Sequence, residues 1–437
     1  MGTVDRTQQP LVPEAAGPPL ALRRWRDRSV LAVALVAVAS GFGQFGAVAA
    51  LGDVARSFGH VVHGSTVADQ AGLSGTELGV GLAVIRLASL GGMPLSGLAD
   101  RLGRRRMLLW TLATGLVLTA VAAISPSYWA FVIIFASGRP MLSATNALAQ
   151  VIAAEQTASS DRAKAVALVA AGYGVGAGLI AIVHSLFLHT LGFRGLFALA
   201  LIPLVVTQFV RGAVPEPARF KVAATEAVHP MPVLGVVGEH LRRFPIVVAL
   251  SFAISVITGP ANTFVFLYAQ SFVHLGGGAT ALMVVGAGVA GLVGLLAGRF
   301  LADRVGRRAT AAAGMVAVAC FGAIAYSGGR TTLVVGYILG VLAGAMLAPA
   351  LGALVNELFP TAVRASVAGW VVAAGVIGAV VGLVIFGAVA DVDNRFGLSA
   401  LVTFLPAAAA AGLFALLPET RGHEPEEMSE RRRGASG

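Results

Sequence analysis

Hydrophobic residues fill most of the chain in stretches of about twenty, and short polar segments separate these stretches. A bilayer core of about 30 Å needs roughly 20 helical residues at 1.5 Å each, so each stretch predicts a membrane-spanning helix. The first half is expected to cross at 29–51, 76–97, 107–125, 129–153, 164–188 and 193–213. The second half is expected to cross at 246–272, 278–299, 309–328, 332–356, 366–389 and 396–417. This pattern predicts an all-α membrane protein with twelve spans, whose longest external loop is 52–75.

One polar segment occurs twice. The run Leu-Ala-Asp-Arg-Leu-Gly-Arg-Arg at 98–105 recurs with one residue changed at 301–308, nearly half a chain length later. An acid, a turn-forming glycine and several arginines do not fit inside hydrocarbon, so each copy predicts a tight aqueous turn between two helices. Repetition at this distance indicates two halves built on one plan.

Further pairs repeat at almost the same distance. Glu155 and Arg162 are matched by Glu357 and Arg364, and Pro215-Glu216 is matched by Pro418-Glu419. We therefore expect two pseudo-symmetric six-helix bundles. The predicted organisation is a cytoplasmic N-terminal tail at 1–28, a bundle at 29–213, a cytoplasmic linker at 214–245, a second bundle at 246–417 and a cytoplasmic C-terminal tail at 418–437.

Composition supports the membrane assignment. Hydrophobic residues make up 57% of the chain and charged residues only 12%, against about 25% charged in soluble domains. A large soluble protein would leave so many uninterrupted apolar runs unexplained. The lone Cys320 excludes an internal disulfide and a thiolate metal cluster. No nucleotide-binding loop or nucleophile–base pair is recognisable, so we expect no enzyme activity, no cofactor and no bound metal.

The formal net charge of +10 suggests nucleic acid binding at first, but the positions of the basic residues indicate otherwise. Arg86 and Arg139 fall inside spans, and only Arg56, Arg194, Arg330 and Arg395 fall on one side of the predicted topology. The other Lys and Arg residues lie on the opposite side, which the positive-inside rule makes cytoplasmic. We expect no nucleic acid partner, both termini in the cytoplasm and, from the Arg-, Ala- and Gly-rich composition, a bacterial inner (plasma) membrane.

Twelve spans arranged as six plus six, with this repeat, resemble the major facilitator superfamily of secondary transporters over roughly 25–430. The most specific residues are the Asp-Arg-x-Gly-Arg-Arg turns at 100–105 and 303–308. The Glu-x6-Arg elements at 155–162 and 357–364, and the Pro-Glu segments after the sixth and twelfth spans, are similar to those of the sugar-porter and metabolite-symporter branches.

In such families these charges imply a cytoplasmic ion-pair network that closes when the outside opens. Asp100 and Asp303 are expected to reach arginines or a helix N-terminus across the seam between the halves. The alternative is that the arginines only fix topology, although the repeated acids favour gating. The candidate gating residues are Asp100, Arg101, Arg104, Glu155, Arg162, Asp303, Arg304, Arg307, Glu357 and Arg364.

Two departures from the family pattern bear on mechanism. Proton-driven sugar porters have an aspartate in the middle of helix one, where this chain has Gly43-Gln44-Phe45. Antiporter families have a Gly-Pro element in helix five, where 172–178 has glycines but no proline. The first departure argues against sugar-type proton coupling, and the second makes drug efflux the weaker interpretation.

Arg86 and Arg139 are the main candidates for substrate binding because each lies near the midpoint of its span. A charge at that depth costs roughly 2.5–3.5 kcal/mol on insertion scales, so it usually faces a cavity and has a function. No Asp or Glu falls in the central part of any predicted span. We infer that the missing anion arrives as substrate, since an arginine fork suits a carboxylate or a phosphate. The alternative is that carbonyls or Ser143, Thr145 and Asn146 satisfy the arginines structurally.

Helix seven contains Gly259-Pro260, which predicts a break near mid-membrane with polar groups beside it. Gln44, Asn262 and Thr263 are therefore the further candidate substrate contacts. His184 can titrate, but it is expected near the outer end of helix five.

These observations predict a secondary transporter that moves a small polar solute, an organic anion or another metabolite, by alternating access. Proton-coupled efflux of drugs or secondary metabolites is the first alternative, and a substrate-sensing receptor on a transporter scaffold is the second. The expected partners are a small-molecule substrate and membrane lipid, with protons as a candidate coupling ion, and the expected state is a monomer.

Overall fold

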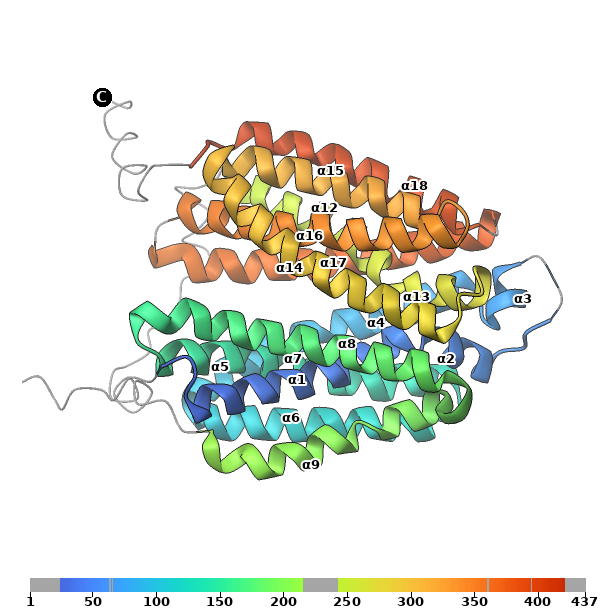
Figure 1. Cartoon of the computed structure of the whole chain (residues 1–437), viewed down its shortest axis with the longest axis horizontal. Helices are drawn as coiled ribbons and strands as arrows, with labels where there is room; N and C mark the ends of the chain where they lie inside the picture. The colour runs from blue at the N-terminus through green and yellow to red at the C-terminus, as the bar shows by residue number, and fades with distance from the viewer. Residues whose placement is uncertain are drawn as a thin grey trace, which may run out of the picture.

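The computed structural model describes residues 24–62, 64, 66–214, 243–359, 361–393 and 395–420, most of which are helical (Figure 1). The N-terminal tail up to residue 23, the linker at 215–242 with Pro215-Glu216, and the tail after Thr420 lie outside the described residues.

The first half of the chain forms one group of helices. In chain order these are α1 (Arg28–Ala49), α2 (Leu51–Phe58), α3 (Val67–Ala71), α4 (Gly75–Ala88), η1 (Ser89–Gly91), α5 (Gly92–Leu102), α6 (Arg104–Val121), η2 (Ala122–Ile124), α7 (Tyr128–Gln156), α8 (Ser159–Ala198), α9 (Leu201–Val210) and η3 (Arg211–Ala213).

The second half forms the other group. Its elements are α12 (Phe244–Thr263), α13 (Val265–Leu267), the π-helical turn η4 (Tyr268–Phe272), α14 (Gly277–Arg304), α15 (Arg307–Ala325), α16 (Arg330–Leu358), α17 (Thr361–Asp393), α18 (Phe396–Ala409) and η5 (Ala410–Leu416).

The helices agree with the predicted all-α, twelve-span arrangement. Within the described residues, eleven stretches are long and apolar enough to cross a membrane. The remaining predicted span is α7, which is 29 residues long and carries Arg139 and Asn146 in its interior. Gly192 divides the long helix α8 into two spans, because its φ of 55° is a left-handed conformation that interrupts the helix.

Equivalent helices pack in equivalent ways in the two halves. α1 packs on α8 as α12 packs on α17, and α6 packs on α7 as α15 packs on α16. The repeated turns are also equivalent, because Gly103 and Gly306 both have positive φ, at 97° and 125°. A residue without Cβ adopts that conformation without strain, so each glycine lets one span end and the next begin immediately.

The two halves meet along a seam formed by α4 against α17 and by α8 against α14. We call the end of the bundle with the turns at 100–106 and 303–308 the basic end, and the opposite end, with α2, α3 and α13, the Asp53 end. Figure 1 shows the two halves coming together at the Asp53 end. The predicted external loop at 52–75 is not a simple loop there, since half of it folds into α2 and α3.

Close packing at the Asp53 end depends on small residues. A Cβ on Gly79 of α4 would lie 2.5 Å from the Leu383 carbonyl oxygen of α17, and one on Gly75 would lie 2.6 Å from the Gly387 carbonyl oxygen. Both distances are shorter than a van der Waals contact. The two helices therefore approach backbone to backbone at this end of the seam, as small residues allow in membrane bundles.

Candidate functional site

A cavity of about 260 Å³ lies midway along the seam. All five residues predicted to contact substrate border it, namely Gln44, Arg86, Arg139, Asn262 and Thr263. The first three come from α1, α4 and α7 of the first half, and the last two come from α12 of the second half. The cavity is therefore shared between the halves.

Arg139 is held in place on one side only. Its Nη1 donates to the backbone carbonyl of Gln44 at 2.9 Å, and its Nε is buried without a hydrogen-bond partner among the described residues. The Gln44 side chain is itself fixed, because its Nε2 donates to Ser40 Oγ at 2.9 Å and to the Leu142 carbonyl at 3.1 Å. A buried donor without an acceptor costs about 1–3 kcal/mol, so the Nε edge of this guanidinium favours an incoming acceptor.

Arg86 lies where its helix is interrupted. It occupies the last turn of α4, and the 3-10 turn η1 follows before the span continues as α5. Its carbonyl accepts a 2.6 Å hydrogen bond from Ser89 Oγ, and its side chain is exposed on the cavity. Within the described residues, neither Arg86 nor Arg139 forms an ion pair with a carboxylate.

The alternative was that carbonyls or nearby polar side chains satisfy the arginines structurally. One backbone carbonyl does so for one arginine N–H group. The Gln44 carbonyl takes Arg139 Nη1, whereas the Thr145 hydroxyl bonds to the Met141 carbonyl and to Thr111. Two cations, Arg86 and Arg139, thus border one cavity. Such an arrangement attracts an anion.

On the opposite wall, the polar side chains of α12 bond to their own helix. Asn262 Nδ2 donates to the Thr258 carbonyl at 2.9 Å, and Thr263 Oγ1 donates to the Gly259 carbonyl at 2.6 Å. The predicted break at Gly259-Pro260 is misplaced, because Pro260 lies inside α12 and the helix ends at Thr263. The irregular backbone follows there, with α13 and the π-helical turn η4.

The candidate gating residues gather at the basic end, and their ion pairs lie within each half. Arg104 pairs with Asp100 at 2.9 Å and with Glu155, while Arg307 pairs with Glu357 at 2.9 Å. The Arg104–Glu155 and Arg307–Glu357 pairs are equivalent in the repeat. Arg162 Nε donates to the Ala154 carbonyl at 3.1 Å, and the Arg364 side chain lies outside the described part of the structure.

The remaining gating candidates are more exposed. Arg101 and Asp303 are exposed, and Asp303 has no ion-pair partner in the described ranges. Arg304 lies over the Phe300 ring with its Cζ 4.2 Å from the ring centroid. Contacts across the seam by Asp100 and Asp303 therefore stay a prediction for another conformation.

The sequence did not reveal the contacts that close the Asp53 end. Asp391 of α17 accepts hydrogen bonds from the Gly75 N–H at 2.6 Å, the Thr76 N–H at 2.7 Å and Thr76 Oγ1 at 2.5 Å. A carboxylate from the second half thus caps the first turn of α4, where the helix dipole favours negative charge. The only available signal was the acid itself, near the end of a span.

Similarity to known proteins agrees with this arrangement. A family profile described as Major Facilitator Superfamily matches residues 33–301 and 274–436. A provisionally assigned metabolite transport protein of Haemophilus influenzae is 28% identical over 298 residues, 64% of this chain and 71% of that protein. A probable 4-methylmuconolactone transporter of Cupriavidus pinatubonensis is 28% identical over 377 residues, 82% of this chain and 86% of that protein.

Among solved structures, the xylose transporter XylE of E. coli in an inward open conformation has a TM-score of 0.72 and 19% identity, covering 92% of this chain and 98% of that one. Two six-helix halves around a shared cavity define a multi-pass membrane carrier of a small solute, not an enzyme. The chain belongs to the Major Facilitator Superfamily, which confirms the resemblance in the repeated turns.

Proposed function

We propose that the protein transports a small organic anion by alternating access, with Arg139 and Arg86 as the groups that bind its negative charge. The observation that carries this proposal is the cavity on the seam, bordered by two guanidinium groups without a carboxylate partner in the described structure.

The geometry of Arg139 favours a carboxylate. Its Nη1 is occupied by the Gln44 carbonyl, which leaves the buried Nε and the adjacent Nη2 as one edge of the fork. A planar carboxylate matches such an edge with two parallel hydrogen bonds, each stronger than a neutral one because both groups are charged. Asn262 and Thr263 lie on the opposite wall, where they contact the polar remainder of the solute.

The size of the cavity supports a small solute. Its volume of about 260 Å³ is below the ~300–1,000 Å³ that is typical of ligand pockets. The relative that is named as a 4-methylmuconolactone transporter supports a lactone or a related metabolite as the kind of solute to test first.

We also propose that the basic end faces the cytoplasm of a bacterial cell and that this structure is open toward it. The arginine-rich turns at that end support the orientation through the positive-inside rule. Close packing at the Asp53 end and likeness to an inward open carrier support the conformation. A green fluorescent protein fused after residue 437 is expected to fluoresce, as it does only on the cytoplasmic side of an inner membrane.

Counterflow in proteoliposomes tests the anion proposal. Vesicles loaded with a carboxylated lactone should accumulate the same labelled solute from outside, whereas neutral sugars and cationic drugs should not compete. Arg139→Gln is expected to slow counterflow by about tenfold to a hundredfold, since a hydrogen bond to a charged group contributes roughly 1.5–3 kcal/mol. Arg86→Gln is expected to raise the half-saturating concentration.

Arg299→Gln is the matched control, because Arg299 is an exposed arginine of α14 that does not border the cavity. It should transport at the wild-type rate. Unchanged counterflow in both cavity variants, or competition by neutral solutes alone, would exclude an anionic substrate. Saturable binding without counterflow would indicate a receptor.

A further inference from the structure

A second cavity, larger than the central one at about 700 Å³, lies in the second half at the Asp53 end. Its walls come from the end of α15, the start of α18 and the π-helical turn η4. In Figure 1, α15 and α18 lie on the side of the second half that faces away from the first half. No described residue borders both cavities, so this cavity is separate from the proposed solute site.

The floor of this cavity is aromatic, and its hydroxyls are hydrogen-bonded within the protein. Tyr268, Tyr326 and Phe396 are buried, and their ring centroids lie 5.2–6.2 Å apart. The Tyr268 hydroxyl donates to the Gly328 carbonyl at 2.8 Å, and the Tyr326 hydroxyl donates to the Ala261 carbonyl at 3.0 Å. The floor therefore presents apolar ring surface to the molecule that fills the cavity.

The side wall of the cavity continues as an apolar stripe on α18. Four large residues of this helix are 40–47% exposed and lie on one helical face, at spacings of three and four residues, namely Leu398, Leu401, Val402 and Leu405. The first two border the cavity, as does Ile324 of α15, which is 41% exposed. Hydrocarbon covers such a stripe in a membrane. The cavity therefore opens sideways into the bilayer, and an apolar chain can run from it along α18.

The rim of the cavity carries a cation. Arg395, directly before α18, borders the cavity and is exposed. No ion pair between described side chains includes it, and Asp391, four residues earlier, accepts hydrogen bonds from Gly75 and Thr76 of the first half. Because α15 ends and α18 begins beside this rim, the cation lies at the depth where the spans end and lipid headgroups begin.

A guanidinium at this depth favours a phosphate. Its planar fork matches two phosphate oxygens, and basic side chains near the membrane surface attract anionic lipids. A zwitterionic lipid brings a cation of its own, which repels Arg395, whereas an anionic lipid supplies net negative charge. A water-soluble anion would bind the cation but leave the apolar stripe and the aromatic floor without a partner.

We propose that this cavity is a binding site for one anionic phospholipid. Its phosphate binds Arg395, its glycerol region covers the aromatic floor, and one acyl chain follows the stripe on α18. The site requires only that the chain spans a membrane, so it depends neither on the transported solute nor on the direction of transport.

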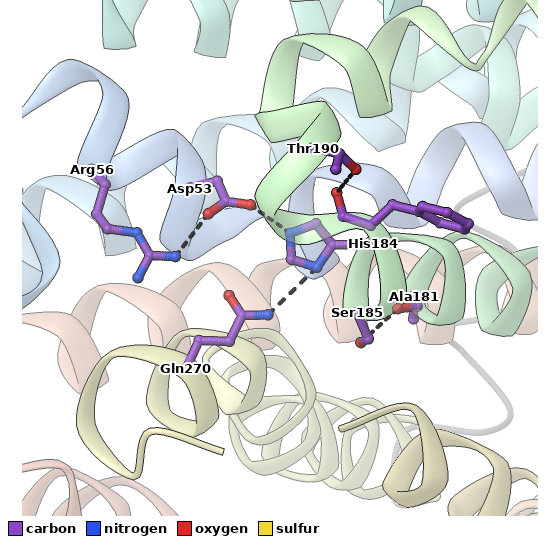
Figure 2. A network of polar contacts seen from close by, with 8 residues as sticks. Asp53, Arg56, Ala181, His184, Ser185, Thr190 and Gln270 are labelled. Carbon is purple, nitrogen blue, oxygen red and sulfur yellow. Dashed lines mark hydrogen bonds and ion pairs between the residues drawn. The ribbon is translucent and has the colours of Figure 1, made fainter. Parts of the chain in front are cut away.

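The bound lipid contacts the same turn that reaches the first half. Tyr268 and Phe272 of η4 border the cavity, whereas Gln270 lies between them on another face of the turn, with its Nε2 3.4 Å from His184 Nδ1 of α8. His184 Nε2 is in turn 2.6 Å from Asp53 Oδ2 (Figure 2). The lipid therefore supports η4 from the membrane side, while the first half contacts it at the seam.

Photo-crosslinking in nanodiscs tests this proposal. The full chain is reconstituted in phosphatidylcholine with a trace of a photoactivatable probe, either phosphatidylglycerol or phosphatidylcholine with the same diazirine-bearing acyl chain. Mass spectrometry then identifies the labelled peptides. We expect the phosphatidylglycerol probe to label 395–405 and 321–327 severalfold more than the phosphatidylcholine probe does. Equal labelling of these segments by the two probes would overturn the proposal.

Arg395→Gln separates this cavity from the general charge of the surface. Arg395 is exposed, so its replacement leaves the core intact, and the two probes should now label the segments equally. Arg330→Gln is the matched control, because Arg330 is an exposed arginine at the same end that does not border the cavity. It should keep the preference for phosphatidylglycerol. A preference that survives Arg395→Gln, or that Arg330→Gln also removes, would refute the assignment.

An excess of glycerol 1-phosphate distinguishes a lipid from a soluble phosphate. It carries a phosphate without acyl chains, so the labelling should not change, and displacement of the probe would replace the lipid with a soluble phosphorylated ligand. All labelling is recorded without transported solute. A wrong anion assignment for the central cavity therefore leaves this result unaffected, and equal labelling by the two probes leaves the anion proposal intact.

Discussion

The two ends of the seam are stabilised in opposite ways. At the basic end, the ion pairs Arg104–Glu155 and Arg307–Glu357 each lie within one half, and they are equivalent in the repeat. Glu419 likewise accepts from the backbone N–H groups of Arg307 and Arg308 in its own half. These contacts fix the helices of a half relative to one another and leave the halves free to separate.

At the Asp53 end, some of the polar contacts cross between the halves. Asp391 caps α4 from the other half, and His184 bonds to Gln270. Neither contact has an equivalent in the repeat. The repeated charges therefore act within each half, whereas the polar contacts between the halves come from residues that the repeat does not duplicate. A rocking carrier needs both kinds of contact, since only the second kind has to break in each cycle.

A steric block at the Asp53 end should have the largest effect. Gly79→Leu places a side chain where a Cβ already comes within 2.5 Å of the Leu383 carbonyl oxygen. We expect the closed Asp53 end to become undetectable and solute exchange to fall more than a hundredfold. The distance between spin labels on Ile124→Cys and Ser327→Cys, one in each half at the Asp53 end, measures the closed population. Counterflow measures the exchange of solute. Gly97→Leu is the control, because a Cβ on Gly97 meets nothing within 4 Å. A closed population in Gly79→Leu would show that this contact is not obligatory.

Loss of the carboxylate cap should have an intermediate effect. Asp391→Asn keeps the size of the side chain but removes the charge that accepts two N–H groups and the Thr76 hydroxyl. Hydrogen bonds to a charged group contribute about 1.5–3 kcal/mol, so the ratio of closed to open Asp53 ends should fall roughly tenfold to a hundredfold. The same spin labels report the ratio. An unchanged ratio would mean that packing of α4 on α17 alone closes this end.

Much of each half was predictable because the depth of a residue in the membrane and the turns between spans both depend on the neighbouring sequence. The spans follow from runs of apolar residues, and the turns follow from Gly103 and Gly306 beside charged residues. Their similar depth in the membrane also explains why the predicted substrate residues meet at one cavity. Gln44, Arg86, Arg139, Asn262 and Thr263 all lie near the midpoint of their spans, so a seam through the middle of the bundle brings them to one cavity.

The seam itself was not predictable. Asp391 and Gly75 are 316 positions apart, and nothing in the repeat links them. Their contact depends on the rotation of α4 and α17 about their axes and on the tilt between the halves, which a single sequence does not determine. The helix break was misplaced for a related reason, because Pro260 is tolerated inside α12 when neighbouring helices support the backbone.

The smallest effect is expected at the basic end, where the gating hypothesis makes its own prediction. The Asp100 side chain is 52% exposed and pairs with Arg104 inside its half, and Asp303 is exposed. Exposed pairs contribute only about 0–1 kcal/mol, so Asp100→Asn with Asp303→Asn should leave the thermal stability almost unchanged. If these acids reach across the seam once the Asp53 end opens, their loss destabilises that open state.

We therefore expect the double variant to favour the present conformation about threefold, a shift opposite in sign to that of Asp391→Asn and measured with the same labels. Arg101→Gln should shift the ratio in the same direction if Arg101 is a partner of these acids. An unchanged ratio in the double variant would mean that the repeated charges serve topology and the structure of each half. Closure would then be controlled from the Asp53 end alone, by contacts that duplication did not supply.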